Sequence, residues 1–513
     1  MDLPYLIRRA ARAYPNSPAV GDRRGTRSLA EVVARAERLA NALDALDVPE
    51  GAAVGVLSEN RVEYVDVDLA LALGRRVRVA LNRRLHRDDF RFALRDCGAR
   101  ALVHSADHAE DAAALADELD LIAINLDGGD GPGETYAELV ADARAAAVVR
   151  SGSDEDPAWI SYTSGTTGRP KGVVLSHRTV REVAFNLLLE FGPQDPGERL
   201  VLTQALSHGA GYFVLPLLIS GGGVYVMDGF VADEVLWAAG QPGVRALKAV
   251  PAMFPALLEA HAAAGGPLGY DSVIYGAAPM PGPILEAALE QFGPVLVQIY
   301  GQTEAPMTLT CLHKEDHARP GQHRTSAGRA WRSVAVEIRD PDGLALPAGE
   351  AGEVTIRGSH HMTGYHGLDE ATAEALRDGW LWTKDIGTID DEGFVHLLGR
   401  RDEMINSGGF NISPREVEHV LQDHPEVVDC VVVGLPDARW GTAVNAVVAL
   451  RADSSVTGEE IIAFARPRLT FRTPKHVLVT GSIPKNAYGK VDRAQIQRVL
   501  EGAGWKDAGA TDR

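Results

Sequence analysis

A segment rich in glycine, serine and threonine has the composition of a loop that binds phosphate. Residues 162–172 have the sequence Tyr-Thr-Ser-Gly-Thr-Thr-Gly-Arg-Pro-Lys-Gly and lie between two apolar, strand-like runs. Glycine lets the backbone approach a ligand closely, the hydroxyls can donate hydrogen bonds, and Lys171 adds a cation. No acidic residue occurs in residues 157–181, although the whole chain has a net charge of −19. This segment therefore predicts a hairpin-like loop at which a polyphosphate would bind.

Other short polar or glycine-rich segments follow this loop along the chain. They are GAAP at 276–279, YGQTE at 300–304, Gly352 with Glu353, Asp385 in DGWLWTKDIG, Gly399 with Arg400, GGFNI at 408–412 and PKNAYGK at 484–490. In this order, over nearly the whole chain, the segments resemble the adenylate-forming superfamily, which includes acyl-CoA synthetases, peptide-synthetase adenylation domains and beetle luciferases. The resemblance implies an α/β fold. A large multi-lobed N-terminal domain with layered sheets and a small β-rich lobe would be followed by a small mobile α+β C-terminal domain.

The resemblance also implies a function, that of an ATP-dependent acid–CoA ligase. Such an enzyme converts a carboxylate and MgATP into acyl-AMP and pyrophosphate, and then transfers the acyl group to CoA with release of AMP. ATP and coenzyme A would be co-substrates, and Mg²⁺ the metal cofactor. The sequence leaves open thioesterification of a preformed acyl-adenylate alone, transfer to a carrier-protein thiol, and luciferase-like oxygenation. The alternative outside enzymes is a non-catalytic adenylate-binding protein, against which Lys490, Glu304 and Lys171 argue.

Several of these segments would form the nucleotide site. ATP and AMP would be bound by Thr163, Ser164, Gly165, Thr166, Thr167, Gly168, Lys171, Gly276, Ala277, Ala278, Tyr300, Gly301, Gln302, Thr303, Asp385 and Arg400. By resemblance, Tyr300 would stack on adenine, while Asp385 and Arg400 would bind the ribose hydroxyls. Thr303 would hydrogen-bond the α-phosphate. Glu304 would hold Mg²⁺, a hard cation that prefers carboxylate and phosphate oxygens.

The resemblance assigns catalytic roles to Lys490, His208, Thr303 and Glu304. Lys490 matches the family's adenylation lysine, and a cation there would stabilise the negative charge that develops where the carboxylate attacks the α-phosphate. His208 falls where acid–CoA ligases often have a histidine between the acyl and thiol passages. Asp402 matches the hinge about which the C-terminal domain rotates after adenylation. The predicted domains are therefore residues 1–401, for ATP and the acid, and residues 402–513, with the catalytic lysine.

Two segments without charged residues would form the pocket for the acid. The predicted lining is His208, Gly209, Ala210, Gly211, Tyr212, Val250, Pro251, Met253 and Gly276. The small residues 209–211 leave volume, which favours a bulky and largely apolar acid: aromatic, alicyclic or terpenoid. The residues predicted to bind CoA are Gly408, Gly409, Phe410, Trp440, Phe471, Arg472 and Lys475. The two glycines would leave room for pantetheine.

One position departs from the family's usual pattern. The family usually has Thr-Gly-Asp before the ribose aspartate, whereas this chain has Thr383, Lys384 and Asp385. Lys384 could pair with Asp385 and compete with the sugar, or it could point to solvent. The first arrangement would weaken the use of ATP and favour a protein that accepts only a preformed acyl-adenylate.

The elements that must position these residues follow from local patterns. Ser28 and Glu31 predict a capping box before an apolar helical face. A second capping box is expected at Ser413 and Glu416, with Pro414 at the first helical position. Residues 334–395 change to short strands and turns, which predict the β-rich lobe.

Bulk composition limits the partners and the compartment. The chain has 513 residues, enough for more than one domain, and its 51 basic and 70 acidic residues disfavour binding to nucleic acid or anionic membranes. The uncharged stretch 209–227 is interrupted by Pro216 and three glycines, so a buried helix and a core strand are expected instead of a membrane span. Three widely spaced cysteines predict buried free thiols, and the polar N-terminus is unlike a signal peptide, which together predict a cytoplasmic protein.

Overall fold

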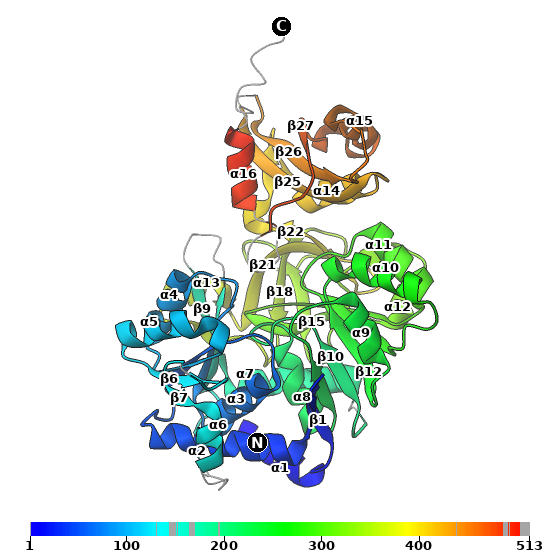
Figure 1. Ribbon diagram of the computed structural model, residues 1–513. Coiled ribbons are helices and arrows are strands. Elements are labelled where there is room, and N and C mark those ends of the chain that lie inside the picture. Colours follow the sequence, from blue (N-terminus) through cyan, green and yellow to red (C-terminus); the bar gives the residue numbers. More distant parts are fainter. Residues whose placement is uncertain are drawn as a thin grey trace.

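The computed structural model describes residues 2–129, 131–142, 150, 152–163, 170–192, 195–437, 439–485, 491 and 493–502. In Figure 1 a large N-terminal body, coloured blue to yellow-green, carries a smaller C-terminal body, coloured yellow to red, at one end. This arrangement confirms the predicted fold class. The boundary after residue 401 stays a prediction; a short 3₁₀ helix, η5 (Arg401–Glu403), spans it.

The largest sheet of the described residues is nine-stranded and mostly parallel. Its strands, in spatial order, are β16 (Arg329–Ala330), β15 (Ala305–Leu312), β14 (Leu296–Gln302), β13 (Ser272–Gly276), β12 (Val244–Ala249), β10 (Arg199–Leu202), β11 (Gly223–Val226), β1 (Pro18–Asp22) and β2 (Gly25–Ser28). Neighbours from β14 to β1 pair in parallel, and β2, β15 and β16 pair antiparallel. Runs of buried valine and leucine are typical of such parallel strands, because both faces are covered.

A second sheet carries the predicted phosphate loop. Its strands, in spatial order, are β19 (Gly364–Tyr365), β9 (Lys171–Ser176), β8 (Pro157–Thr163), β4 (Val77–Ala80), β3 (Ala53–Leu57), β5 (Ala101–His104), β6 (Ile122–Asn125) and β7 (Glu134–Thr135). Strands β8 and β9 pair antiparallel, with Thr163 opposite Lys171. The predicted hairpin is therefore confirmed at its base, while residues 164–169 lie outside the described part.

Helices cover both sheets of the N-terminal body (Figure 1). They are α1 (Leu3–Ala13), α2 (Leu29–Ala45), α3 (Val62–Leu73), α4 (Arg87–Asp96), α5 (Ala109–Leu119), α6 (Tyr136–Asp142), α7 (His177–Phe191), α8 (Val214–Ile219), α9 (Ala232–Ala239), α10 (Phe254–Ala264), α11 (Gly282–Phe292), α12 (Lys314–Ala318) and α13 (Asp369–Ala375), with 3₁₀ turns η1 (Ala106–His108), η2 (Gly211–Phe213), η3 (Pro251–Met253) and η4 (Gln322–Thr325). The predicted capping box of Ser28 and Glu31 is formed at the start of α2. One hydrophobic cluster joins the two sheets, and a second lies between the nine-stranded sheet and α9–α11.

The β-rich lobe and the C-terminal body complete the chain. The lobe contains β17 (Ala335–Arg339), β18 (Gly352–Arg357), β20 (Leu376–Arg377), β21 (Trp380–Ile389) and β22 (Val395–Arg400), as residues 334–395 predicted. The C-terminal body contains the hairpin β23 (Ile405–Ser407) and β24 (Phe410–Ile412), the sheet β25 (Val427–Asp437), β26 (Gly441–Leu450) and β27 (His476–Thr480), and the helices α14 (Pro414–Gln422), α15 (Gly458–Leu469), η6 (Thr470–Arg472) and α16 (Arg493–Gly502).

The second capping box is formed only on one side. Ser413 Oγ accepts a hydrogen bond from the Glu416 N–H at 3.2 Å, and Pro414 occupies the first position of α14, as predicted. The Glu416 carboxylate, however, accepts from the Arg472 guanidinium. Because this tertiary partner takes the carboxylate, the side chain ties α14 to η6 instead of closing the box.

Two further expectations concern the thiols and the uncharged stretch. Cys97, Cys311 and Cys430 are free thiols, and Cys97 is only half-buried. Residues 209–227 form η2, α8 and β11, which is the expected buried helix and core strand. Across the described residues, no helix combines the length and apolar character needed to span a bilayer.

Candidate active site

Predicted nucleotide and acyl segments gather at one edge of the nine-stranded sheet. Residues 206–212 follow β10, residues 250–253 follow β12, residues 276–278 end β13 and residues 300–304 end β14. These four strands are parallel neighbours, so their carboxyl ends lie at the same edge. In open α/β sheets this edge is where ligands bind. The structure thus brings together segments that are about 100 residues apart in the sequence.

The backbone at this edge is shaped by glycines that cannot carry a side chain. A Cβ at Gly276 would collide with the Ile299 carbonyl oxygen, and one at Gly301 would lie 2.5 Å from the Met307 nitrogen. Ala277 has φ +70°, a left-handed conformation that non-glycine residues rarely adopt. Backbone strain of this kind concentrates at functional sites, because the surrounding structure must hold it.

Tyr300, Asp385 and Arg400 form one hydrogen-bonded cluster from three strands. The Tyr300 hydroxyl donates to Asp385 Oδ2, and Arg400 Nε lies 2.9 Å from Asp385 Oδ1 across the β21–β22 pair. Burial, and then the nearby Asp385 carboxylate, raise the pKa of Tyr300, so its hydroxyl stays protonated and continues to donate. These contacts hold the carboxylate in one orientation, which the predicted ribose contact requires.

Glu304, the predicted magnesium ligand, is oriented by a tyrosine that the sequence analysis missed. Tyr365 Oη donates to Glu304 Oε1 at 2.8 Å, and Lys171 Nζ lies 5.0 Å from the centroid of the Tyr365 ring. Burial, and then the Glu304 charge, raise the pKa of Tyr365, which keeps this donor protonated. Tyr365 reaches the site because β19 pairs with β9. No motif spacing in the sequence indicates that long-range pairing.

The carboxylate of Glu304 fits the coordination that Mg²⁺ prefers. This ion usually takes one or two protein carboxylates together with substrate phosphates and waters. Within the described part of the chain, no group of three or more His, Cys, Asp or Glu side chains is placed to hold a metal. A single carboxylate near the base of the predicted phosphate loop therefore fits an ion that would arrive with a nucleotide.

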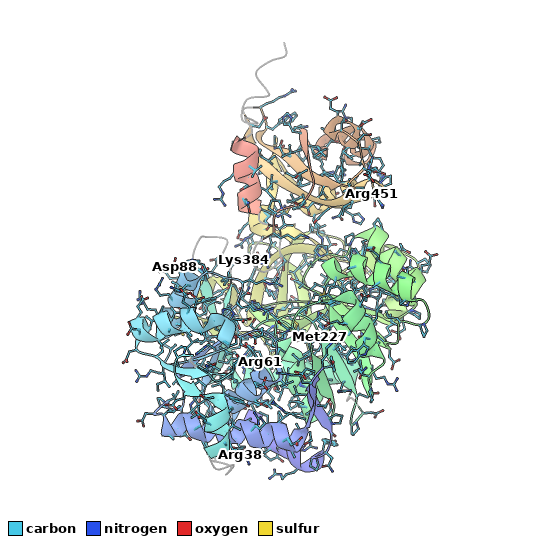
Figure 2. The ribbon with its side chains drawn as sticks, viewed as in Figure 1. Arg38, Arg61, Asp88, Met227, Lys384 and Arg451 are labelled. Atoms are coloured by element: carbon cyan, nitrogen blue, oxygen red, sulfur yellow. The ribbon has the colours of Figure 1, made fainter. Side chains whose placement is uncertain are left out.

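Lys384 takes neither of the two positions considered from the sequence. Its ammonium lies 3.8 Å from Glu374 Oε1, and Asp385 pairs with Arg400 instead. Its backbone N–H donates to Glu353 Oε1 at 2.8 Å, with φ +62°. Figure 2 shows Lys384 in the large body, close to where the C-terminal body adjoins. The left-handed conformation explains why glycine suits this position, and the structure removes the specific reason to expect weakened ATP use.

The acyl segment 206–212 is fixed at its start by Asn60, which the sequence analysis did not identify. Asn60 Oδ1 accepts from the Leu206 N–H at 2.8 Å. Its Nδ2 donates to the carbonyl oxygens of Gln204 and Met227 at 2.7 and 2.9 Å. One amide therefore joins the loop after β3 to the segments after β10 and β11.

Arg78 holds the same segment from the sheet that carries the phosphate loop. Its Nη2 donates to the Leu206 carbonyl at 2.7 Å, and its Nε donates to Asp68 at 2.7 Å. The guanidinium lies 4.3 Å from the centroid of the Trp159 ring, and that ring packs against Tyr212 with centroids 4.8 Å apart. Arg78 is buried, so the ion pair to Asp68 is what makes its charge tolerable there.

Within the acyl segment, Gly209 and Gly211 differ in what they permit. A Cβ at Gly209 would lie 3.3 Å from Met307 Cε, the end of a flexible side chain, whereas at Gly211 it would collide with the Leu206 carbonyl oxygen. A side chain at Gly209 would therefore have to displace the end of Met307, while Gly211 is required by the backbone. His208 Nδ1 lies 2.8 Å from Ser207 Oγ, which orients the ring.

The residues predicted for CoA form two groups on the C-terminal body. In the first, the Gly408 N–H donates to the Trp440 carbonyl at 2.9 Å, and a Cβ on Gly408 would lie 2.9 Å from the Trp440 ring. Lys475 Nζ lies 4.8 Å from the centroid of that ring, while Gly409 has open space around it. The flat face of Trp440, the Lys475 ammonium and two glycines without side chains therefore lie together.

The second group lies where β24 of the hairpin meets η6. The Phe410 and Phe471 rings have centroids 4.8 Å apart, and 58% of Phe410 and 53% of Phe471 remain exposed. The Arg472 guanidinium lies 5.8 Å from the Phe471 ring. Two large exposed aromatic side chains beside a cation are suited to a ligand with a heterocycle and phosphates.

Some predicted residues cannot be placed. Lys490 and the loop residues Ser164, Gly165, Thr166, Thr167 and Gly168 lie outside the described residues. Their roles, and the roles assigned to the other site residues, stay predictions.

Two family models match the chain. The AMP-binding enzyme model matches residues 7–366, and the model of the AMP-binding enzyme C-terminal domain matches residues 416–490. The chain belongs to the AMP-binding enzyme family.

Relatives of this AMP-binding enzyme include named ligases. Feruloyl-CoA synthase from an Amycolatopsis species is 35% identical over 497 residues, covering 96% of this chain and 97% of its own. The solved amide bond synthetase McbA from Marinactinospora thermotolerans matches with a TM-score of 0.89 and 29% identity, covering 97% of this chain and 99% of its own. o-Succinylbenzoate CoA synthetase from Bacillus subtilis, solved with an acyl-adenylate intermediate, matches with a TM-score of 0.86 and 28% identity, covering 97% and 98%.

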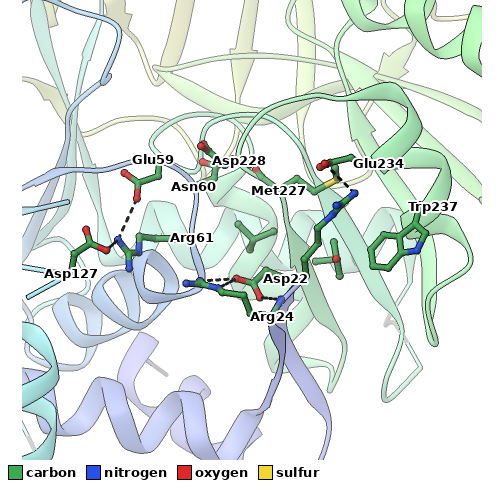
Figure 3. A pocket seen from close by; sticks show the side chains of 13 residues that line it. Asp22, Arg24, Glu59, Asn60, Arg61, Asp127, Met227, Asp228, Glu234 and Trp237 are labelled. Atoms are coloured by element: carbon green, nitrogen blue, oxygen red, sulfur yellow. Dashed lines mark hydrogen bonds and ion pairs between the residues drawn. The ribbon is translucent and has the colours of Figure 1, made fainter. Parts of the chain in front are cut away.

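A hollow of about 390 Å³ lies elsewhere on this AMP-binding enzyme, beside β1 and β11 (Figure 3). Its charged side chains largely neutralise one another: Arg61 lies 2.6 Å from Asp127, and Arg24 lies 2.7 Å from Asp22. None of the predicted site residues lines it. Asn60, which lines this hollow, also hydrogen-bonds the Leu206 N–H of the predicted acyl segment.

Proposed function

We propose that this enzyme is an AMP-forming acid–CoA ligase that activates a bulky carboxylic acid with ATP. The observation that supports the proposal is that two side-chain clusters of different chemistry occur in one chain. One is the sheet edge with the Tyr300, Asp385 and Arg400 cluster, suited to a nucleoside. The other is the exposed face of Phe410 and Phe471, suited to the nucleotide part of CoA. The named relatives, two of which are CoA synthetases, support the same assignment.

In the first half-reaction, a carboxylate oxygen of the acid attacks the α-phosphorus of ATP. The new bond is a P–O bond, and the bond to the bridging oxygen breaks, so that pyrophosphate leaves with that electron pair. Thr303 and Lys490 would stabilise the charge that develops on the α-phosphate. Glu304 would hold Mg²⁺, which supplies neutralising charge on the phosphates when bound. Asp385, held by Tyr300 and Arg400, would fix the ribose.

In the second half-reaction, the thiol of CoA attacks the acyl carbonyl of the adenylate. A C–S bond forms, the C–O bond to phosphate breaks, AMP leaves with that electron pair, and the thiol proton passes to solvent. For this step the C-terminal body would rotate about Asp402 and bring Gly408 and Gly409 to the acyl group, so that pantetheine passes over backbone without side chains. A domain rotation of this kind commonly limits turnover.

The acid would bind against residues 208–212 and 250–253, with Gly276 at the edge of the nucleotide site. These segments supply Tyr212, Val250, Pro251 and Met253 as apolar surface, and Gly209 lies against the end of the Met307 side chain. An apolar wall of this kind favours an aromatic, alicyclic or terpenoid body. CoA and the pantetheine of a carrier protein present the same thiol, so the same chemical step serves either acceptor.

The test is a panel of acids assayed for pyrophosphate release and, by mass spectrometry, for acyl-AMP and acyl-CoA. We expect both products from at least one bulky acid. Lys490→Ala should abolish pyrophosphate release but keep thioester formation from synthetic acyl-AMP, whereas Asp402→Pro should do the reverse, because proline fixes φ at the hinge. Lys314→Met, at a surface lysine of α12, is the matched control.

Other outcomes would select the alternatives. Thioester formation from synthetic acyl-AMP without any pyrophosphate release would indicate the half-reaction alone. If the thioester forms only with a phosphopantetheinylated carrier protein, that protein and not CoA is the acceptor. Nucleotide binding by calorimetry with no turnover of any acid would overturn the proposal in favour of a binding protein.

A further inference from the structure

Lys248 is a buried cation without a counter-charge. It lies on β12 with 2% of its surface exposed. Its ammonium donates one hydrogen bond, to the Ala249 carbonyl at 3.1 Å, and lies 6.0 Å from the centroid of the Phe213 ring. No carboxylate of the described chain lies within ion-pair distance of it, and burial alone lowers the pKa of Lys248 to about 7. An ammonium has three donors, so this group can still bind an acceptor.

The side chain of Lys248 points to the inner face of the nine-stranded sheet. Its neighbours Leu247 and Ala249 belong to the cluster beneath α9–α11, and successive side chains of a strand alternate between faces. Lys248 is paired with Leu202 on β10 and Ile274 on β13, which both belong to the cluster that joins the two sheets. The ammonium therefore lies on the face opposite the covering helices.

This face leads directly to the predicted acyl pocket. Two residues further along the strands, at the edge where the site lies, the same face carries Val250 and Gly276. Two residues of a parallel strand span about 7 Å, so Lys248 lies about that far below the edge. The ammonium also lies beside the first predicted acyl segment, because Phe213, whose ring centroid is 6.0 Å away, follows Tyr212 in η2. The second predicted segment begins at Val250, two residues after Lys248.

We propose that Lys248 binds a second carboxylate at the far end of the substrate, so that the acid is a dicarboxylate with an apolar body. The inference rests on the proposed function and refines its acyl specificity. The reactive carboxylate would lie at the edge with the nucleotide, the apolar body would contact segments 208–212 and 250–253, and the distal carboxylate would accept from the ammonium. A buried charge is costly until it is paired, so the substrate would supply the missing counter-charge.

The experiment compares matched acids that differ only at the far end. The pairs are 4-carboxycinnamate with 4-methylcinnamate, and suberate with octanoate, each assayed for kcat/KM of pyrophosphate release. The proteins are the unmodified chain, Lys248→Met, which keeps the length of the side chain without charge, and the surface control Lys314→Met. A hydrogen bond to a charged group corresponds to a change of about tenfold to a hundredfold. We expect Lys248→Met to lose that much for the dicarboxylate of the preferred pair and little for its monocarboxylate partner.

A binding readout independent of turnover accompanies the kinetics. The dicarboxylate alone should raise the melting temperature of the unmodified chain and of Lys314→Met but not that of Lys248→Met. Equal use of both acids by the unmodified chain, or an equal loss for both acids in Lys248→Met, would overturn the Lys248 assignment and leave the ligase proposal standing. If none of the three proteins releases pyrophosphate with any acid of the full panel, the proposed function itself fails.

Discussion

Replacing Lys248 by methionine should make the folded protein more stable at neutral pH. Burial lowers the pKa of Lys248 from its ordinary value of 10.5 to about 7 in the folded state. Between these values the unfolded chain binds a proton that the folded chain does not, so stability rises with pH. The penalty of burying the amine is therefore fully present below about pH 7 and disappears as the pH approaches about 10.5. Methionine has no proton to lose and removes the penalty.

The size of the effect follows from the same two pKa values. At about 1.4 kcal/mol per pKa unit, a fall from 10.5 to about 7 corresponds to roughly 5 kcal/mol, which is an upper limit because local relaxation and water entry reduce it. The lost hydrogen bond to the Ala249 carbonyl offsets about 1 kcal/mol. Lys248→Met should therefore gain roughly 2–4 kcal/mol near pH 6.5, and the gain should vanish near pH 10.

The assay is urea unfolding of the unmodified chain, Lys248→Met and Lys314→Met at about pH 6.5, 8 and 9.5, at one ionic strength. The comparison between variants removes the general effect of pH on a chain with net charge −19, because that effect is shared. A methionine variant no more stable than the unmodified chain at pH 6.5 would refute the reasoning. So would a gain that does not change with pH, since cavity or packing effects are independent of protonation.

Three other substitutions test the site. Lys384→Gly should stabilise the protein by up to about 1 kcal/mol, because relief of the left-handed conformation exceeds the entropy that glycine adds to the unfolded chain. Pyrophosphate release should not change. A clear fall in release would show that the contact with Glu374 matters. Tyr365→Phe removes the donor to Glu304 and should raise the Mg²⁺ concentration for half-maximal pyrophosphate release about tenfold. Thioester formation from synthetic acyl-AMP should change little. An unaltered Mg²⁺ dependence would contradict the role given to Tyr365. Gly209→Ile should shift the preference between bulky and small acids at least about tenfold without weakening nucleotide binding, and an unchanged acid profile would place the pocket wall elsewhere.

The sequence by itself determined the family and the fold class, and it predicted most of the segments that the structure gathers at one sheet edge. Short motifs suffice for this, because residues such as Tyr300 and Glu304 lie at one strand end, and the spacing within a motif fixes their relation. The β8–β9 hairpin at the phosphate loop and the cap at Ser28 are local in the same way: a turn and a first helical turn involve only neighbours in sequence.

Only the tertiary structure decided which partners these residues have. Tyr365 meets Glu304, Arg472 takes the carboxylate of Glu416, and Lys384 turns toward Glu374 instead of Asp385. Each of these pairs joins different strands, helices or turns, so no local pattern predicts it.

Lys248 is the clearest example of a residue whose surroundings the sequence does not predict. The acyl segments themselves contain no charged residue, and the lysine two positions before Val250 looks like an ordinary strand residue in the sequence. Its burial, its lack of a counter-charge and its place beside Phe213 arise only when β10, β12 and β13 pair and the face of the sheet is covered. The physical reason is that solvation and electrostatic partnership are properties of the assembled core, whereas the sequence specifies directly only what neighbouring residues do to one another.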